Sequence, residues 1–300
     1  MINRFMEYLE NFPQWLAIVL IFCIVLGLIV ICSLLLLIYN FICEYMNKSD
    51  EPDDNFYVDA AYFHEKGQRA RQEDSLYVSP LEDYNKHGLI ALVTDGMGGM
   101  AHGDFVSRFV VSEFSKMSHE DYDNREAILK KIKDVSNSVF KKYNREAGAT
   151  LVLVRINNNM LDLYSVGDSD LILIRNGKST VLNHKQNYGA ILISNLAGAG
   201  KTTEDAYLVP EARQLIDFIG NNNPNVSYTR QSLRLQDDDV ILIASDGVLD
   251  ALSVDNLAEY ASLGDARRSA SRIKSEIKSL KLNSQDNYTC ILLKLRHMIF

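Results

Sequence analysis

Cysteine is scarce in this 300-residue sequence, and its four cysteines form no framework. Cys23, Cys32 and Cys43 lie in or beside one apolar run, while Cys290 stands alone near the C-terminus. The sequence has no Cys-x-x-Cys spacing, which argues against a cysteine metal site and against a disulfide scaffold. This pattern is typical of a reducing compartment and favours a cytoplasmic location for the globular part.

Blocks of like charge are missing too. The formal net charge of -8 at pH 7 is spread along the chain instead of being gathered in runs. Nucleic acid attracts proteins with a strong excess of lysine and arginine, so we expect no nucleic acid partner. The sequence also has no visible internal repeat.

The longest segment without a charged side chain includes residues 16–42. At about 1.5 Å per residue, a helix over this run would cross a hydrocarbon core of about 30 Å. A secretory signal would have a shorter apolar core, a basic start and a small-residue cleavage site, whereas here Arg4 is the only basic residue before the run and its end reads YNFICE (39–44). We therefore predict a single-pass membrane protein, with an N-terminal flank over residues 1–14 and a transmembrane helix over residues 15–43.

The residues after this run predict a linker and then one globular domain. Residues 44–55 are polar and acidic, with Pro52 as a breaker, and predict a short juxtamembrane linker. Residues 56–300 carry the remaining patterns. Only Arg4 and Lys48 flank the apolar run, too few basic residues to decide its orientation, so sidedness stays open on this evidence.

Short apolar runs rich in β-branched residues alternate with amphipathic segments in residues 56–300 and predict an α+β sandwich. The predicted strands cover residues 56–63, 89–94, 150–156, 161–166, 171–175, 240–244 and 288–295, and the predicted helices cover residues 104–117, 124–143, 254–261 and 266–280. Short turns between neighbouring strands indicate antiparallel sheets. Residues 183–225 break the pattern and predict a partly helical insertion over one face.

Acidic residues recur where the predicted strands end. The segments are GQRARQED (67–74), TDGMGG (94–99), GDS (167–169), SDG (245–247) and DNYT (286–289). A strand holds a carboxylate rigidly, and a following glycine lets the backbone turn and bring a carbonyl close to a cation. Converging carboxylates repel one another unless a cation lies between them. Because oxygen donors suit hard ions, the pattern predicts a magnesium or manganese centre.

In this order, the motifs resemble those of the metal-dependent serine/threonine protein phosphatases, the PPM family, also called protein phosphatase type 2C. The resemblance covers about residues 56–295 and rests on matching positions in six motifs: Gly67, Arg69, Gln72, Glu73 and Asp74; Asp95, Gly96, Met97, Gly98, Gly99, Gly103 and Ser107; Gly148, Ala149 and Thr150; Gly167, Asp168 and Ser169; Ser245, Asp246 and Gly247; Asp286 and Asn287.

This resemblance implies a four-layer α-β-β-α sandwich of two antiparallel sheets flanked by helices, with two Mn²⁺ or Mg²⁺ ions at one end. Asp95 would bridge both ions, Asp246 and Asp286 would hold one, and Glu73 with the Gly96 carbonyl would hold the other. The remaining assignments are Asp74, acting through metal-bound water, Arg69, binding the substrate phosphate, and the supporting residues Asp168 and Asn287. The implied activity is hydrolysis of phosphoserine and phosphothreonine by a water that the two metals activate. The implied substrates are proteins that a serine/threonine kinase near the same membrane phosphorylates.

Several positions depart from the family pattern. Met97 replaces a histidine that can donate a proton in some relatives, which leaves His64, His102 and His184 as alternatives. Glu146 is the nearest candidate ligand for a possible third ion. Asp170 replaces a common arginine after GDS, and Asn183, His184 and Lys185 replace the usual Asp-His pair, which keeps open the alternative of a catalytically weak membrane scaffold that binds phosphoproteins.

A different motif suggests a third hypothesis. AGAGKTT, at residues 197–203, ends like a nucleotide-binding phosphate loop, but Asn195 stands where that loop needs its first glycine. A flexible glycine-rich loop is the simpler interpretation of this segment.

Overall fold

A computed structural model describes residues 14–49, 56–97, 102–196 and 209–298. The chain divides into two compact units, Met1–Glu51 and Pro52–Phe300. The nucleotide-loop motif at residues 197–203 and the glycines at positions 98 and 99 lie outside the described residues.

The first unit contains one long helix, α2 (Gln14–Ser49). Its segment Ile21–Asn40 has a mean hydropathy of 3.3 and is apolar and long enough to cross a membrane. Large apolar side chains such as Leu28 and Leu37 are exposed along α2, which no core in the described part of the chain covers. The helix includes the whole predicted transmembrane segment of residues 15–43.

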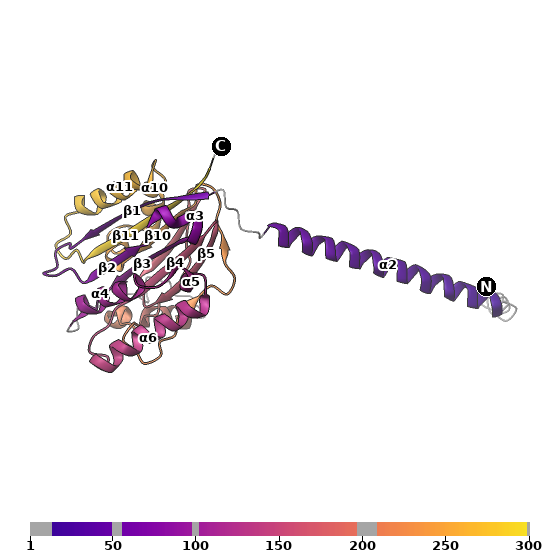
Figure 1. The fold of residues 1–300 in the computed structure, drawn as a ribbon, viewed down its shortest axis with the longest axis horizontal. Helices are drawn as coiled ribbons and strands as arrows, with labels where there is room; N and C mark the ends of the chain where they lie inside the picture. The colour runs from indigo at the N-terminus through magenta and orange to yellow at the C-terminus, as the bar shows by residue number, and fades with distance from the viewer. Residues whose placement is uncertain (1–13, 50–55, 98–101, 197–208, 299–300) are drawn as a thin grey trace. The chain divides into compact units, whose positions relative to one another are not determined.

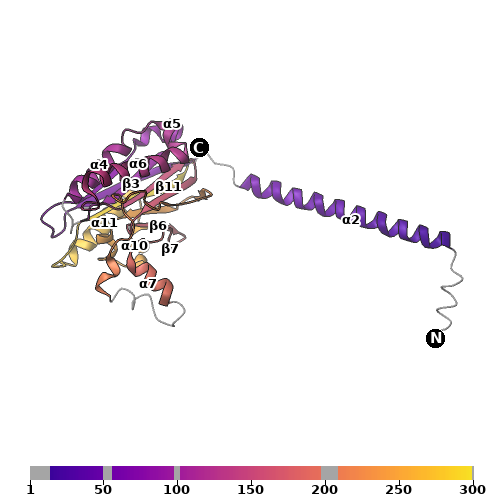
Figure 2. The same ribbon diagram turned by 90° about the horizontal axis from the view of Figure 1, so that it is seen from below.

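The second unit contains two antiparallel sheets (Figures 1 and 2). One has the order β1-β11-β10-β6-β7 and the other has the order β2-β3-β4-β5-β8, with β9 also paired to β5. The strands are β1 (Phe56–Glu65), β2 (Asp74–Val78), β3 (Leu89–Asp95), β4 (Leu151–Asn157), β5 (Met160–Val166), β6 (Asp170–Arg175), β7 (Lys178–Val181), β8 (Ser227–Tyr228), β9 (Leu233–Arg234), β10 (Val240–Ala244) and β11 (Tyr288–His297).

Helices cover the outer face of each sheet, so the predicted four-layer sandwich is confirmed. The helices α4 and α6 pack on the β2–β8 sheet, and α10 and α11 pack on the other. The α-helices of this unit are α3 (Tyr84–His87), α4 (Gly103–Phe114), α5 (His119–Tyr122), α6 (Arg125–Tyr143), α7 (Tyr188–Leu196), α9 (Asp246–Leu249), α10 (Val254–Ala261) and α11 (Ala266–Ser279).

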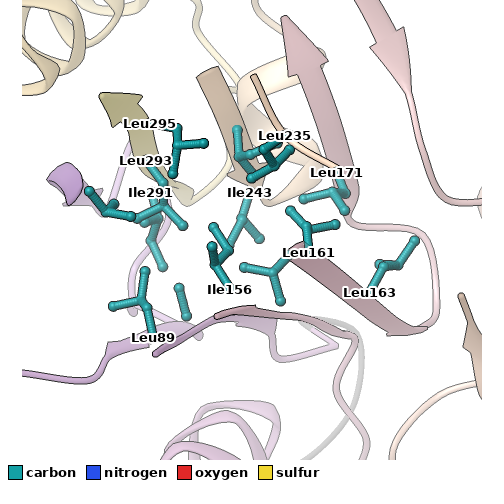
Figure 3. Packing of buried hydrophobic residues seen from close by; sticks show 14 of the residues in the cluster. Leu89, Ile156, Leu161, Leu163, Leu171, Leu235, Ile243, Ile291, Leu293 and Leu295 are labelled. Carbon is teal, nitrogen blue, oxygen red and sulfur yellow. The ribbon is translucent and has the colours of Figure 1, made fainter. Parts of the chain in front are cut away.

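Strand β10 shows how the sequence builds two cores at once. Its five residues are all buried, because successive side chains point to opposite faces of a sheet and both faces are covered. Ile241 and Ile243 enter the core between the sheets, shown in Figure 3, whereas Leu242 packs toward α10 and α11. An apolar run without alternation therefore marks a central strand here.

The sequence patterns did not predict β2 or β7. Strand β2 begins at Asp74 inside an acidic motif, and β7 is a four-residue edge strand with largely exposed side chains. The predicted insertion is partly helical, as expected, since it contains α7 and a 3₁₀ turn at Pro210–Arg213.

Candidate metal and phosphate site

Four acidic side chains from distant segments meet at one end of the sandwich. Asp95 is the last residue of β3 and pairs with Asp74 at the start of β2. Asp246 follows β10, and Asp286 precedes β11, the neighbouring strand. A cavity of about 360 Å³ is lined by Asp95, Asp246 and Asp286, together with Asp168 and Arg69.

The backbone around Asp95 is held by Thr150. The Asp95 backbone N–H donates to Thr150 Oγ1 at 3.0 Å, and the Thr150 N–H donates to the Asp95 carbonyl at 2.8 Å. Thr150 Oγ1 also lies 2.6 Å from Ser169 Oγ. Thr150 and Ser169, from the Gly-Ala-Thr and Gly-Asp-Ser motifs, therefore hold the backbone of Asp95, while Thr150 and Asp168 also line the cavity.

Asp74 lies behind Asp95 and is 2% exposed. Ser245 Oγ donates to its Oδ2 at 2.8 Å, but its Oδ1 is buried with no hydrogen-bond partner among the described residues. The Oδ1 atom of Asp246 is also buried and has no hydrogen-bond partner among the described residues. Two buried carboxylate oxygens therefore lack a donor.

Burial and mutual repulsion raise the pKa values of this carboxylate group. Burial raises the pKa of Asp74 to about 6 and that of Asp246 to about 7, the latter with help from Asp168, Asp250 and Asp286. Burial also raises the pKa of Asp95 well above its ordinary value, and the adjacent Asp74 and Asp246 add to the effect. Removing a carboxylate from water and placing it beside others disfavours its charged form.

The loop of residues 67–73 contributes Arg69 to the cavity lining. Arg69 Nη2 donates to Asp286 Oδ2 at 2.5 Å, and the Arg69 side chain is 48% exposed. Asn287 holds this loop, because its Oδ1 accepts from the Glu73 N–H at 2.8 Å and its Nδ2 donates to the Lys66 carbonyl at 2.7 Å. Asn287, which the sequence analysis assigned a supporting role, thus contacts the backbone of the loop that carries Arg69.

Two glycines permit the close approach of these segments. A Cβ on Gly96 would lie 2.3 Å from the Gly103 carbonyl oxygen and 2.7 Å from the Glu73 carbonyl oxygen. A Cβ on Gly247 would lie 2.0 Å from the Asn287 carbonyl oxygen. Backbone atoms cannot move aside as a flexible side chain can, so both Asp-Gly steps need glycine.

The donor set fits hard divalent cations. The cavity offers carboxylate oxygens without histidine or cysteine among its described lining residues, and two nearby carboxylate oxygens are unpartnered. Among the described residues, no group of three or more His, Cys, Asp or Glu side chains is positioned to hold a metal ion. Asp286 is engaged by Arg69 instead, so a cation there would have to replace the guanidinium as its partner.

Comparison with known proteins identifies the family. The family model described as protein phosphatase 2C matches residues 63–283, more than half of the chain. The chain belongs to the protein phosphatase 2C family.

Named relatives in this family come from bacteria and plants. Serine/threonine protein phosphatase PstP of Mycobacterium tuberculosis is 24% identical over 233 residues, which cover 75% of this chain and 42% of PstP. Probable protein phosphatase 2C 7 of Oryza sativa subsp. japonica is 25% identical over 277 residues, which cover 83% of this chain and 72% of that protein. The chain thus spans less than half the length of PstP.

Solved structures show the same protein phosphatase 2C fold. PppA of Pseudomonas aeruginosa, described as a key regulatory component of T6SS, matches with a TM-score of 0.68 and 22% identity, covering 80% of this chain and 98% of PppA. The catalytic domain of PstP in complex with two manganese ions matches with a TM-score of 0.61 and 21% identity, covering 80% of this chain and 99% of that chain.

Some of the other residues that we predicted to take part in the reaction line the cavity, and others do not. Asp168 and Met97 line it, whereas none of the three candidate proton donors does: His64, His102 and His184. His64 instead donates from its ring to the Asp74 carbonyl at 3.1 Å.

The cavity lining also includes five side chains that the sequence analysis did not identify: Arg145, Arg213, Gln214, Leu215 and Phe218. The Arg145 guanidinium lies 5.6 Å from the centre of the Phe218 ring. Glu146, the candidate third-ion ligand, is exposed, and its neighbour Arg145 lines the cavity instead. All but Arg145 belong to the predicted insertion, where no recognisable motif could identify them.

The departures from the family pattern after GDS form a buried polar cluster. Lys185 Nζ lies 2.8 Å from Asp170 Oδ2, and Asp170 is 1% exposed. Asn183 Nδ2 donates to the Ser169 carbonyl, and Asn183 Oδ1 accepts from the Leu171 N–H. None of these side chains is among the described residues that line the cavity, although the charge of Lys185 opposes the rise in the pKa of Asp168, which does line it.

Proposed function

We propose that this chain hydrolyses phosphoserine and phosphothreonine on proteins with the help of two Mn²⁺ or Mg²⁺ ions. The observation that carries this proposal is the convergence of Asp95, Asp246 and Asp286 with Arg69 around one cavity. The PstP structure with two manganese ions supports the choice of metal.

The ligand assignment is the one that the resemblance to the family implies, and the convergence of Asp95, Asp246 and Asp286 on one cavity supports it. Asp95 would bridge the two ions, Asp246 and Asp286 would hold one of them, and Glu73 with the Gly96 carbonyl would hold the other. Asp74, buried behind Asp95, would act through a water. When bound, the ions supply Lewis acidity, which activates a water for attack on phosphorus and offsets charge on the phosphate oxygens.

Residues of the chain itself would bind the phosphate and hold the site in position. Arg69 is free to turn from Asp286 toward a phosphate, because its side chain is about half exposed, and its planar guanidinium suits two phosphate oxygens. Thr150 and Ser169 hold Asp95 in place, so little reorganisation accompanies the reaction. Asn287 keeps the Arg69 loop against the cavity.

The test is a metal titration of activity with the full chain in detergent. We expect turnover of p-nitrophenyl phosphate and of a phosphothreonine peptide only with Mn²⁺ or Mg²⁺. Asp95→Asn and Asp246→Asn should each lose more than about 100-fold, since even changes behind metal ligands cost about 10- to 100-fold. Asp134→Asn, an exposed position on α6, is the matched control. Equal turnover in all three variants would reject the site.

The proposed substrates are phosphorylated proteins that a serine/threonine kinase modifies. The scaffold alternative was motivated by the residues after GDS, and these lie outside the cavity lining. Binding of a third ion would appear as a second phase in the metal titration of activity.

We further propose that α2 anchors the chain in a membrane as a single span, with the phosphatase domain in the cytoplasm. The apolar segment Ile21–Asn40 supports this, together with the scarcity of cysteine. Wild-type protein should stay in the membrane pellet after alkaline carbonate extraction. A Leu28→Lys/Ile31→Lys variant should be released, because each lysine costs about 3 kcal/mol at the centre of a span.

Sidedness has its own measurement. Protease added to sealed inside-out vesicles should digest the phosphatase domain, whereas protease added to intact cells or spheroplasts should leave it whole. The opposite pattern would place the domain outside and contradict the cytoplasmic assignment.

A further inference from the structure

A second cleft lies beside the catalytic cavity. It has a volume of about 250 Å³ and lies between the segment that follows β1 and the segment that follows α11. Its polar lining includes Lys66, Gln68, Lys278, Lys281 and Gln285.

The cleft is positively charged in a chain whose net charge is negative. Lys66, Lys278 and Lys281 are exposed, and none of them takes part in an ion pair with another described residue. Glu65, the acidic side chain in the lining, is already paired with Lys274 at 3.2 Å. Three lysine charges are therefore left uncompensated at this position in a chain of net charge -8.

Helix stability accounts for only two of the three lysines in this cleft. Lysines near the C-terminus of a helix interact favourably with its dipole, which accounts for Lys278 in the last turn of α11 and, to a lesser degree, for Lys281 just beyond it. Lys66 belongs to a different segment, about two hundred residues earlier in the chain, and α11 does not need it as a capping residue. Helix stability therefore does not explain why Lys66 lies in the same cleft as the other two lysines.

The cleft shares a wall with the catalytic cavity. The Gln68 N–H donates to the Gln285 carbonyl at 2.8 Å, and both residues line the cleft. The next residues along the two segments are Arg69 and Asp286, which line the catalytic cavity and pair at 2.5 Å. At about 3.5 Å per residue of extended chain, a bound peptide would pass from one site to the other within about three residues.

We infer that this cleft binds acidic side chains that flank the phosphorylated residue of a protein substrate. This inference rests on the proposed phosphatase function and names the substrate class that the site prefers. Lysine ammonium groups attract carboxylates, or a second phosphate, without demanding one geometry, which suits a variable peptide segment. An acidic residue within about three positions of the phosphothreonine would reach the lysines while Arg69 binds the phosphate.

The experiment compares substrates on the full chain in detergent. The triple variant Lys66→Glu/Lys278→Glu/Lys281→Glu should lose about 10-fold or more in kcat/KM for a phosphothreonine peptide with flanking glutamates, because three exposed attractions become repulsions. Its kcat/KM for the same peptide with flanking glutamines, and for p-nitrophenyl phosphate, should stay unchanged. The loss should shrink at high salt, as expected of exposed charges.

A matched control separates the cleft from net charge. Lys86→Glu/Lys133→Glu/Lys178→Glu makes the same change of charge at exposed lysines outside the cleft. This variant should retain most of the preference for the glutamate peptide. An equal loss in both triple variants, or no loss in either, would overturn the inference.

Two further arms separate the possible failures. Anisotropy of a labelled, unphosphorylated glutamate-rich peptide should detect binding that the cleft variant loses, and this readout needs no turnover. Binding of this kind by a wild-type chain that cannot hydrolyse p-nitrophenyl phosphate would defeat the proposed function but not the cleft. In nanodiscs, a loss that appears only with phosphatidylserine, for all substrates alike, would assign the lysines to lipid headgroups and overturn the inference.

Discussion

Asn287 joins two parts of the site that are 214 residues apart along the chain. Its amide accepts from the Glu73 N–H and donates to the carbonyls of Lys66 and Arg71. One buried side chain thus places the Arg69 loop against the start of β11, where Asp286 lies. Such contacts commonly tune metal affinity as strongly as they tune stability.

Asn287→Ala should weaken metal use without removing a ligand. We expect the Mn²⁺ concentration for half-maximal activity to rise by about 10- to 100-fold, because Glu73 and Arg69 would lose their fixed positions. Asn283→Ala, an exposed asparagine of the same segment, should behave like the wild type. An unchanged metal requirement in Asn287→Ala would show that the loop holds its place by other contacts.

At the scale of elements, β6 begins beside a buried ion pair. Burial raises the pKa of the Asp170 carboxyl, and Lys185 opposes this effect, while Asp168 and Asp250 add repulsion. Lys185 is partly exposed, whereas Asp170 is almost completely buried. The start of β6 therefore depends on Lys185, which follows β7 in the chain.

Lys185→Ala should destabilise the domain by about 2 to 4 kcal/mol, because Asp170 would keep its burial and lose its partner. Asp170→Asn in the same background should recover part of this loss, and Lys178→Ala on the exposed face of β7 should have little effect. Thermal or denaturant unfolding followed by circular dichroism would measure all three. Full stability in Lys185→Ala would mean that Asp170 is hydrated in that variant.

The same variant should show a defined dependence on pH. Since the folded-state pKa of Asp170 is raised, the folded state retains a proton that the unfolded state releases near pH 4. The contribution of this carboxyl to stability is thus full below about pH 4 and is lost as pH rises through the raised value. The deficit of Lys185→Ala should be larger at pH 8 than at pH 4, as unfolding at the two pH values would reveal.

For the whole molecule, the carboxylate group is a source of instability that a cation would relieve. Without a cation, the buried carboxylates at the site repel one another and two of their oxygens lack partners. A ligand that binds only the folded state stabilises it by about 2.7 kcal/mol at 100 times its dissociation constant.

Saturating Mn²⁺ should therefore raise the melting temperature of the phosphatase domain by about 5 °C or more relative to EDTA. The shift should be strongly reduced in Asp246→Asn and intact in Asp134→Asn. This readout does not depend on turnover. An identical melting temperature with Mn²⁺ and with EDTA would argue against resident cations.

Local patterns along the chain were enough to predict the main strands, the family and the acidic motifs, because each depends on apolar runs, on Asp-Gly steps and on their order. The absence of charge also predicted the apolar helix. Strand β2 was missed because its pairing with β3, and not its own composition, makes it a strand.

Folding alone determines which side chains lie together in space. It brought Arg145 and Phe218 into the cavity, paired Asp170 with Lys185, and set Lys66 beside the end of α11. These contacts join residues far apart in the chain, in segments that have no repeating pattern. Packing of the two sheets fixes such distances, and no local pattern in the sequence records them.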